Sequence, residues 1–169
     1  MTQMKKIKKN KGYTLIEMLF YIVLFAMLSA VAINSLIVMM RSFKEVGIQR
    51  EIAQGGEIME RISREIRGAD KINSVVDVNG DLKLDTKDDA GADKLVEFVL
   101  TNSNIRLLEN GNYSGDLNSP NIKVGALTFN QINTTKGQAV KVFLTISSKK
   151  DSQNRSYQYY DTVVLRGNY

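Results

Sequence analysis

The sequence predicts an α+β fold in which a long N-terminal helix packs on an antiparallel β-sheet head. Two observations predict this class. Residues 13–67 combine an uncharged apolar run with a later stretch in which apolar residues recur every three or four positions, the period of a helix. From residue 72 onward apolar and polar residues alternate, which is the period of a strand. One helical segment followed by a series of strands is the element order of an α+β protein.

Positive charge is concentrated at the start of the chain. The 169 residues include 23 Lys and Arg against 18 Asp and Glu, a formal net charge of +5. Five of the lysines lie in residues 1–12, which hold no acidic residue, so the chain beyond Gly12 carries 18 charges of each sign. A neutral chain lacks the clustered cations that bind phosphates, and we therefore expect no nucleic-acid partner.

The residue types missing from the sequence exclude several kinds of chemistry. The chain has no histidine and no cysteine. These absences exclude a Ser-His-Asp hydrolase, a thiol nucleophile, a Cys-ligated zinc site and a disulfide framework. The sequence also shows no nucleophile–base pair and no phosphate-cradling loop, so we predict that the protein is not an enzyme.

An uncharged apolar run occupies residues 18–40. Its only clearly polar members are Ser29, Asn34 and Ser35. A helix of about 20 apolar residues crosses the bilayer core, so this run is long enough to span a membrane. The lysines before it, against a single Arg41 after it, predict a cytoplasmic N-terminus and an external remainder. The alternative is a secretory signal peptide cleaved after residues 30–32, but the run continues past that point and Glu17 lies at its start.

The residues at the start of this run form a motif that carries most of the functional information. They read Lys11-Gly12-Tyr13-Thr14-Leu15-Ile16-Glu17-Met18. This motif, behind a basic leader, closely resembles the prepilin signal of type IV pilins and type II secretion pseudopilins. The resemblance implies cleavage between Gly12 and Tyr13 by a membrane prepilin peptidase, N-methylation of Tyr13 and retention of the apolar helix.

Two positions depart from the pattern of that family. Tyr13 stands where Phe is usual. Residues 32–35 lack the helix-kinking proline that the family commonly carries in this part of the mature chain. Without that proline we expect a straighter first helix, with Asn34 as its weakest point.

Glu17 lies where a charge is costly. A carboxylate at the centre of a membrane helix costs about 2.5–3.5 kcal/mol on insertion scales, which makes such a residue a functional candidate. In the family that the motif resembles, the carboxylate at this position pairs with the freed α-amine of a neighbouring subunit. The resemblance therefore implies that Glu17 acts in assembly; the alternative is a carboxylate that extends to the membrane interface without a partner.

The chain is expected to comprise four segments. They are a cleaved basic leader (1–12), a transmembrane or filament-core helix (13–40), an amphipathic continuation of that helix (41–68) and a β-rich globular head (69–169). The apolar face of the continuation is formed by Ile48, Ile52, Gly55, Met59, Ile62 and Ile66.

Charged pairs and a glycine pair add detail to this amphipathic continuation. Glu57 with Arg61 and Glu60 with Arg64 are expected ion pairs on its polar side. Residues 55–56, a Gly-Gly pair, predict a close approach of the helix backbone to a sheet.

Strands account for most of the head. They are expected at residues 72–78, 81–84, 95–100, 104–108, 122–133, 139–147 and 157–166. Asn79-Gly80 predicts a type I′ hairpin between the first two strands. Residues 110–121 are expected to form a loop and residues 149–155 a polar hairpin tip, and of Tyr157, Tyr159 and Tyr160 one or two should be buried. The strand-rich layout and the Val163-Val164-Leu165-Arg166 ending resemble the J/W-type minor pseudopilins.

One stretch of the head has the composition of a calcium loop. Its candidate ligands are Asp77, Asn79, Asp81, Asp85 and Asp88. Their spacing resembles an EF-hand or dockerin-like loop, in which oxygen ligands surround Ca²⁺. Leu82 occupies the position of the turn glycine and Asp88 that of the bidentate glutamate, so the fit is imperfect. The alternative is a hairpin with solvated acids, and Ca²⁺ is the only cofactor that the sequence suggests.

Two functions from different classes follow from these features. The leading one is a minor pilin or pseudopilin that co-assembles, near the tip, into a type IV pilus or type II secretion pseudopilus. Its partners would be other pilin-like subunits, the prepilin peptidase and the bacterial inner membrane, which it would cross once before entering the filament. The alternative is a monomeric, membrane-anchored binding domain outside the cytoplasm that uses the calcium loop. If the assembly serves DNA uptake, a small DNA-contacting patch is expected from three tyrosines and three cations: Tyr157, Tyr159, Tyr160, Lys149, Lys150 and Arg155.

Overall fold

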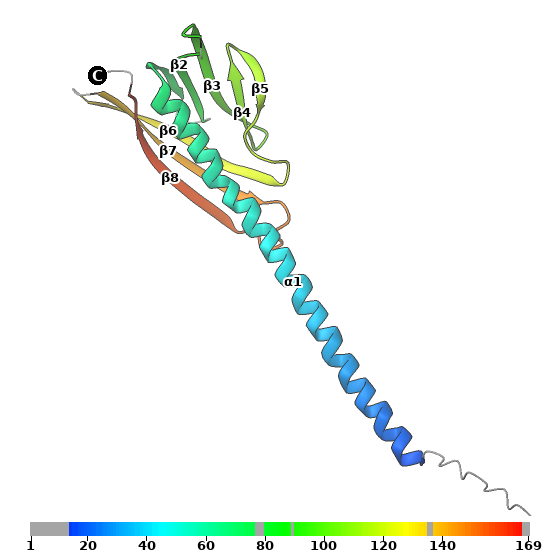
Figure 1. Cartoon of the computed structure of the whole chain (residues 1–169). Coiled ribbons are helices and arrows are strands. Elements are labelled where there is room, and N and C mark those ends of the chain that lie inside the picture. Colours follow the sequence, from blue (N-terminus) through cyan, green and yellow to red (C-terminus); the bar gives the residue numbers. More distant parts are fainter. Residues whose placement is uncertain (1–13, 77–79, 89, 135–136, 167–169) are drawn as a thin grey trace, which may run out of the picture. The chain divides into compact units, whose positions relative to one another are not determined.

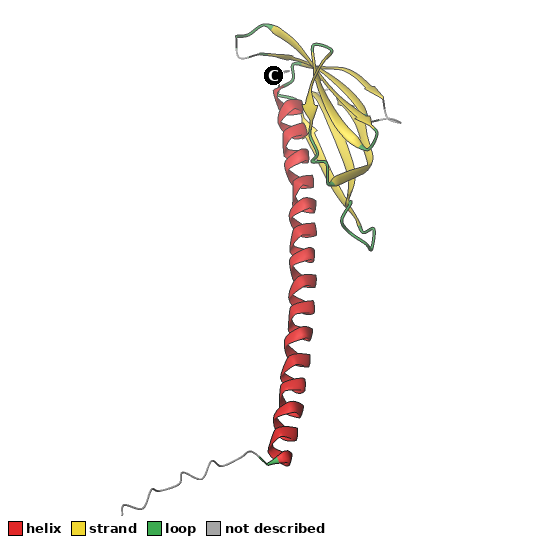
Figure 2. Cartoon of the chain, turned by 90° about the vertical axis from the view of Figure 1, so that its right-hand side faces the viewer, coloured by secondary structure: helices red, strands yellow, loops and turns green. Residues whose placement is uncertain are grey.

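The computed structural model describes residues 14–76, 80–88, 90–134 and 137–166 (Figure 1). The chain divides into two compact units, Met1–Glu45 and Val46–Tyr169. Helix α1 (Leu15–Gly68) has residues in both units, and every strand of the described residues belongs to the second. Figure 2 distinguishes the helix from the strands by colour. The predicted α+β class, a long N-terminal helix with antiparallel sheets, is therefore confirmed.

In the first unit, α1 exposes its apolar side chains on all sides. None of the residues in its most apolar window is buried within the chain, and by length and composition the helix could cross a membrane. A helix that is apolar all round needs cover from lipid or from other protein. The helix continues unbroken through residues 32–35, and the Ser35 hydroxyl donates a hydrogen bond to the Val31 carbonyl (2.9 Å).

In the second unit, one face of α1 is buried. All the members of the predicted apolar face are buried, and so are three residues that the periodicity did not predict: Glu51, Ile58 and Ser63. On the solvent side, Arg64 and Glu60 form the expected ion pair, with 3.9 Å between the Arg64 Nη2 and Glu60 Oε1 atoms. Arg61, however, pairs with Glu65 (2.9 Å) and not with Glu57, because a partner four residues later is as close on the helix surface as one four residues earlier.

The strands form two antiparallel sheets. In chain order they are β1 (Lys71–Val76), β2 (Asp81–Lys87), β3 (Asp93–Thr101), β4 (Asn104–Glu109), β5 (Asn112–Asp116), β6 (Ile122–Thr134), β7 (Gly137–Ser148) and β8 (Ser156–Val164). The first sheet has the order β1-β2-β3-β4-β5 and the second the order β6-β7-β8. Strands that follow one another in sequence are neighbours within each sheet, as in a series of hairpins.

Two features of this layout differ from the sequence prediction. The head contains two sheets, whereas a single sheet was expected. Strand β5 lies inside the segment 110–121, which was predicted to be a loop. The reason is that β5 is an edge strand whose side chains are mostly exposed, so its sequence has none of the apolar alternation that marks a half-buried strand.

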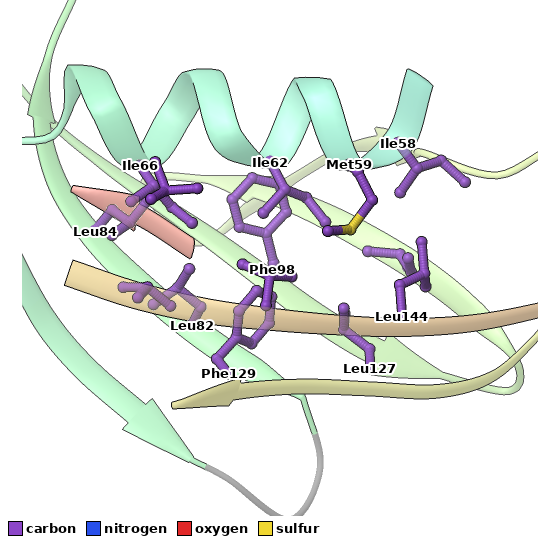
Figure 3. Packing of buried hydrophobic residues seen from close by; sticks show 14 of the residues in the cluster. Ile58, Met59, Ile62, Ile66, Leu82, Leu84, Phe98, Leu127, Phe129 and Leu144 are labelled. Carbon is purple, nitrogen blue, oxygen red and sulfur yellow. The ribbon is translucent and has the colours of Figure 1, made fainter. Parts of the chain in front are cut away.

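The core lies where α1 and both sheets meet (Figure 3). The helix contributes Ile58, Met59, Ile62 and Ile66. The five-stranded sheet contributes residues that include Leu82, Leu84 and Phe98, and the three-stranded sheet contributes Leu127, Phe129 and Leu144 among others. The rings of Phe98 and Phe129, one from each sheet, lie 6.5 Å apart between centroids. The helix and the two sheets therefore share one hydrophobic core.

Candidate functional site

The N-terminus of α1 is capped by Thr14. The Thr14 carbonyl accepts hydrogen bonds from the backbone N–H groups of Glu17 (3.1 Å) and Met18 (3.2 Å), and its hydroxyl oxygen lies 3.4 Å from the Glu17 nitrogen. Thr14 and Glu17 have the spacing of a capping box, in which the N-cap side chain satisfies a free N–H group of the first turn. The helix begins at Leu15, directly after this cap. The two predicted processing residues, Gly12 and Tyr13, lie outside the described residues.

The Glu17 side chain is only partly exposed, and its carboxylate accepts a hydrogen bond from another side chain. The Tyr21 hydroxyl, one turn further along the helix, donates to its Oε1 (3.2 Å). Within the described ranges no Lys or Arg forms an ion pair with Glu17. The motif predicted a role for Glu17, but the contacts that Thr14 and Tyr21 make with it were not predicted. The spacings Thr-x-x-Glu and Glu-x-x-x-Tyr could have revealed them, because these positions are neighbours at the start of a helix.

The predicted calcium ligands are partly engaged in other contacts. Asp81 and Asp85 lie in β2, so their Cα atoms are about 13 Å apart at about 3.3 Å per residue. The ligands of one Ca²⁺ lie about 2.3–2.6 Å from the ion, so this spacing does not bring the two carboxylates together around one ion. Both carboxylate oxygens of Asp85 accept hydrogen bonds from the Asn73 amide, at 3.0 and 3.3 Å. Asp88 Oδ1 accepts the backbone N–H groups of Ala90 (2.9 Å) and Ala92 (2.8 Å), which orders the β2–β3 turn.

The environment of Asp81 differs from that of the other acids. Its Oδ1 is buried without a hydrogen-bond partner. Burial and the nearby Glu97 carboxylate raise the pKa of Asp81, and Lys83 opposes them in part. Asp77 and Asn79 lie outside the described residues, and no three Asp, Glu, His or Cys side chains within those residues come together as a metal site. The pairing of β1 with β2 favours the hairpin alternative, and the calcium assignment stays a prediction.

A buried carboxylate connects α1 to the three-stranded sheet. Glu51, only 7% exposed, accepts hydrogen bonds from the Ser148 hydroxyl (2.5 Å) and the Lys150 ammonium (2.6 Å). Burial acts to raise the pKa of Glu51, but the hydrogen bonds from Lys150 and Ser148 outweigh it and leave the pKa below its usual value. This buried charge is therefore compensated, and it fixes the β7–β8 turn to the helix.

The β7–β8 turn uses its cations for internal contacts. Lys149 donates to the Pro120 carbonyl (2.7 Å), Lys150 binds Glu51, and Arg155 Nε binds Asp151 Oδ2 (2.7 Å). These three cations are the ones that could have formed a DNA-contacting patch. Because each already binds an oxygen of this chain, contact with a phosphate would have to compete with that bond.

Asp151 orders the same turn. Its side chain is almost fully buried and accepts the backbone N–H groups of Gln153 (3.0 Å) and Arg155 (3.1 Å) as well as the Arg155 guanidinium. The hydrogen bond from Arg155, helped by that from Gln153, lowers the pKa of Asp151 to about 2. The carboxylate therefore stays ionised far into the acid range.

We expect Asp151 to make the stability of the second unit depend on acid pH. Since the pKa is lower in the folded than in the unfolded state, its contribution is complete above about pH 4 and is lost as the pH falls toward 2. Asp151→Asn should lower stability at pH 7 and flatten the loss between pH 4 and 2. Urea unfolding of the full chain in detergent, followed by tyrosine fluorescence, measures this. Asp93→Asn, at an exposed acid, is the control, and equal pH profiles for the wild type and Asp151→Asn would contradict the expectation.

Comparison with known proteins adds information on the N-terminal part of the chain. The chain has no significant match among the curated proteins or the solved structures. Residues 7–33 match the family model of the prokaryotic N-terminal methylation motif. The matched stretch includes Gly12, Tyr13, the Thr14 cap and Glu17, together with residues 18–33 of the apolar run. The match supports the type IV pilin-like family and, with it, a membrane-anchored protein that is a substrate of a prepilin peptidase.

Proposed function

We propose that this protein is a minor pilin or pseudopilin, cleaved by a prepilin peptidase between Gly12 and Tyr13, methylated on Tyr13 and co-assembled into a filament. The observation that carries the proposal is the methylation motif, which extends into the first part of a capped helix whose most apolar window has no residue buried by the described part of the chain. Such a helix can exchange lipid contacts for contacts with other subunits. Type IV pilin-like proteins are structural and not enzymatic.

The start of α1 gives a physical reason for pairing between subunits. Cleavage after Gly12 would leave the ammonium group of Tyr13 one residue before the Thr14 cap, at the positive end of the helix dipole. A cation there is unfavourable, and in apolar surroundings it requires an anion. Glu17 of a neighbouring subunit would supply that anion. The pairing would set the register of one subunit against the next.

The arrangement in the cell follows from the charge of the leader. Residues 1–12 would remain in the cytoplasm until cleavage, residues 13–40 would cross the bacterial inner membrane, and residues 69–169 would fold outside it. Residues 41–68 would continue the helix into the head. After extraction from the membrane the subunit would belong to the pilus or pseudopilus.

A minor subunit of the J/W type is the finer part of the proposal. It is supported by the strand content of the head, in which β1 to β8 follow α1 as two sheets of sequential hairpins. For such a subunit we propose a position near the filament tip. A secretion pseudopilus, a competence pilus and an adhesive pilus would all accept such a subunit.

Processing tests the proposal. When the chain is co-expressed with a prepilin peptidase, intact-mass spectrometry should show the loss of residues 1–12 and the gain of one methyl group on Tyr13. A Gly12→Leu chain should keep the leader, because the residue before the cleaved bond is changed, whereas Ser29→Ala should be processed normally. Retention of the leader by the wild-type chain would contradict the proposal and favour an anchored, monomeric binding domain.

A further inference from the structure

The contact between Tyr21 and Glu17 has no role in capping the helix. The Tyr21 hydroxyl donates to Glu17 Oε1 (3.2 Å) from one turn further along α1, and the Tyr21 ring lies edge-on to Phe20 with centroids 6.5 Å apart. Thr14 already satisfies the backbone N–H of Glu17. The Tyr21 hydroxyl therefore acts on the carboxylate group of Glu17 and not on its backbone.

In an apolar environment the Tyr21 hydroxyl and the Glu17 carboxylate satisfy each other's hydrogen-bonding capacity. A carboxylate removed from water requires hydrogen-bond donors, and a tyrosine hydroxyl in the same surroundings requires an acceptor. The two positions are four apart, so they lie on one face of the helix without any change in the backbone. Glu17 is thus held at both ends, its backbone by Thr14 and its Oε1 by Tyr21.

We propose that Tyr21 is a positioning residue for Glu17, which fixes Oε1 so that Oε2 faces outward to receive the α-amine of a neighbouring pilin-like subunit. This inference rests on the proposed function. A flexible glutamate would have to be ordered when two subunits meet, and that ordering would reduce their affinity. With Tyr21 in place, the carboxylate is ordered before the neighbour arrives.

The test separates the hydrogen bond from its effect on assembly. Tyr21→Phe removes the hydroxyl and keeps the ring, and Phe20→Leu is the matched control that changes an adjacent aromatic residue without touching the bond. The first readout is the side-chain carboxyl ¹³C signal of Glu17 in the full chain in lipid bicelles, assigned with Glu17→Gln. The second is the fraction of the chain that enters filaments in a host with a prepilin peptidase and pilin-like partner subunits.

We expect Tyr21→Phe to move the Glu17 signal and to reduce incorporation at least about tenfold, the lower end of the factor that one hydrogen bond to a charged group supplies. Phe20→Leu should change neither. An unmoved Glu17 signal overturns the inference, and so does a Tyr21→Phe chain that enters filaments as the wild type does. If the wild type itself fails to enter filaments, the proposed function is overturned and the inference with it.

Discussion

Replacement of Glu17 by alanine is expected to leave membrane insertion intact and to reduce incorporation into filaments at least tenfold. Insertion depends on the apolar run of residues 18–40, which the substitution lengthens at its N-terminal end. Incorporation depends on an anion for the ammonium group of the neighbouring subunit. Removal of one partner from a buried ion pair costs about 3–5 kcal/mol, because the other charge stays buried without compensation. One tenfold change corresponds to about 1.4 kcal/mol, so tenfold is the lower limit.

The measurement compares two fractions of the same cells. Resistance to alkaline extraction reports insertion, and the amount of the chain in sheared filaments reports incorporation. Glu57→Ala is the control, since Glu57 is an exposed acid on the same helix outside the apolar run. Filaments that contain the Glu17→Ala chain at the wild-type level would contradict the assembly role of Glu17.

Alanine at Gly55 and alanine at Gly56 are expected to change stability in opposite directions. A Cβ atom at Gly55 would lie 2.4 Å from Tyr159 Cε2 and 2.8 Å from Ile146 Cδ1, well inside contact distance. The Tyr159 ring cannot move away freely, because its hydroxyl donates to the Ile52 carbonyl (2.7 Å). Overpacking typically costs about 1–3 kcal/mol and a lost hydrogen bond about 1 kcal/mol, against a gain in helix propensity of up to about 1 kcal/mol. We expect Gly55→Ala to destabilise the second unit by about 2 kcal/mol.

Gly56 provides the matched control one residue later. A Cβ atom there would have no neighbour within 4 Å, so Gly56→Ala should gain only helix propensity and stabilise by about 1 kcal/mol. Urea unfolding of the full-length variants in detergent, followed by circular dichroism, gives both free energies. Equal effects at the two positions would show that Tyr159 does not approach the helix as described.

The fold could be predicted where the period of the apolar residues is regular. The buried face of α1 and the antiparallel strands followed from spacings of three to four and of two. Edge strand β5 could not be predicted, because its mostly exposed side chains leave no alternation. The division into two sheets also left no signal, since inward-facing residues alternate in the same way whichever sheet they belong to.

The candidate site could be predicted in part. The motif from Lys11 to Met18 identified the N-terminal region independently of any fold. Glu51 was not predicted, because an acidic residue on a helix is expected to be exposed unless a buried partner is known. Its partners, Ser148 and Lys150, lie nearly a hundred residues later in the sequence. The calcium ligands were chosen by loop spacing, which assumes that the residues are not in a strand, whereas Asp81 and Asp85 belong to β2.

The position of the buried core along the chain bears on the order of events during biogenesis. Every buried hydrophobic residue in the described part of the chain falls between Ile48 and Leu165. On the proposed function, the second unit, Val46–Tyr169, can therefore complete its folding while residues before it are still in lipid. Passage from the bilayer to a filament would then exchange one set of external neighbours for another and would break no contact in the core of this unit. The free-energy cost of extraction would then come only from the membrane segment, residues 13–40. Substitutions that change the stability of the second unit would therefore leave this cost unchanged.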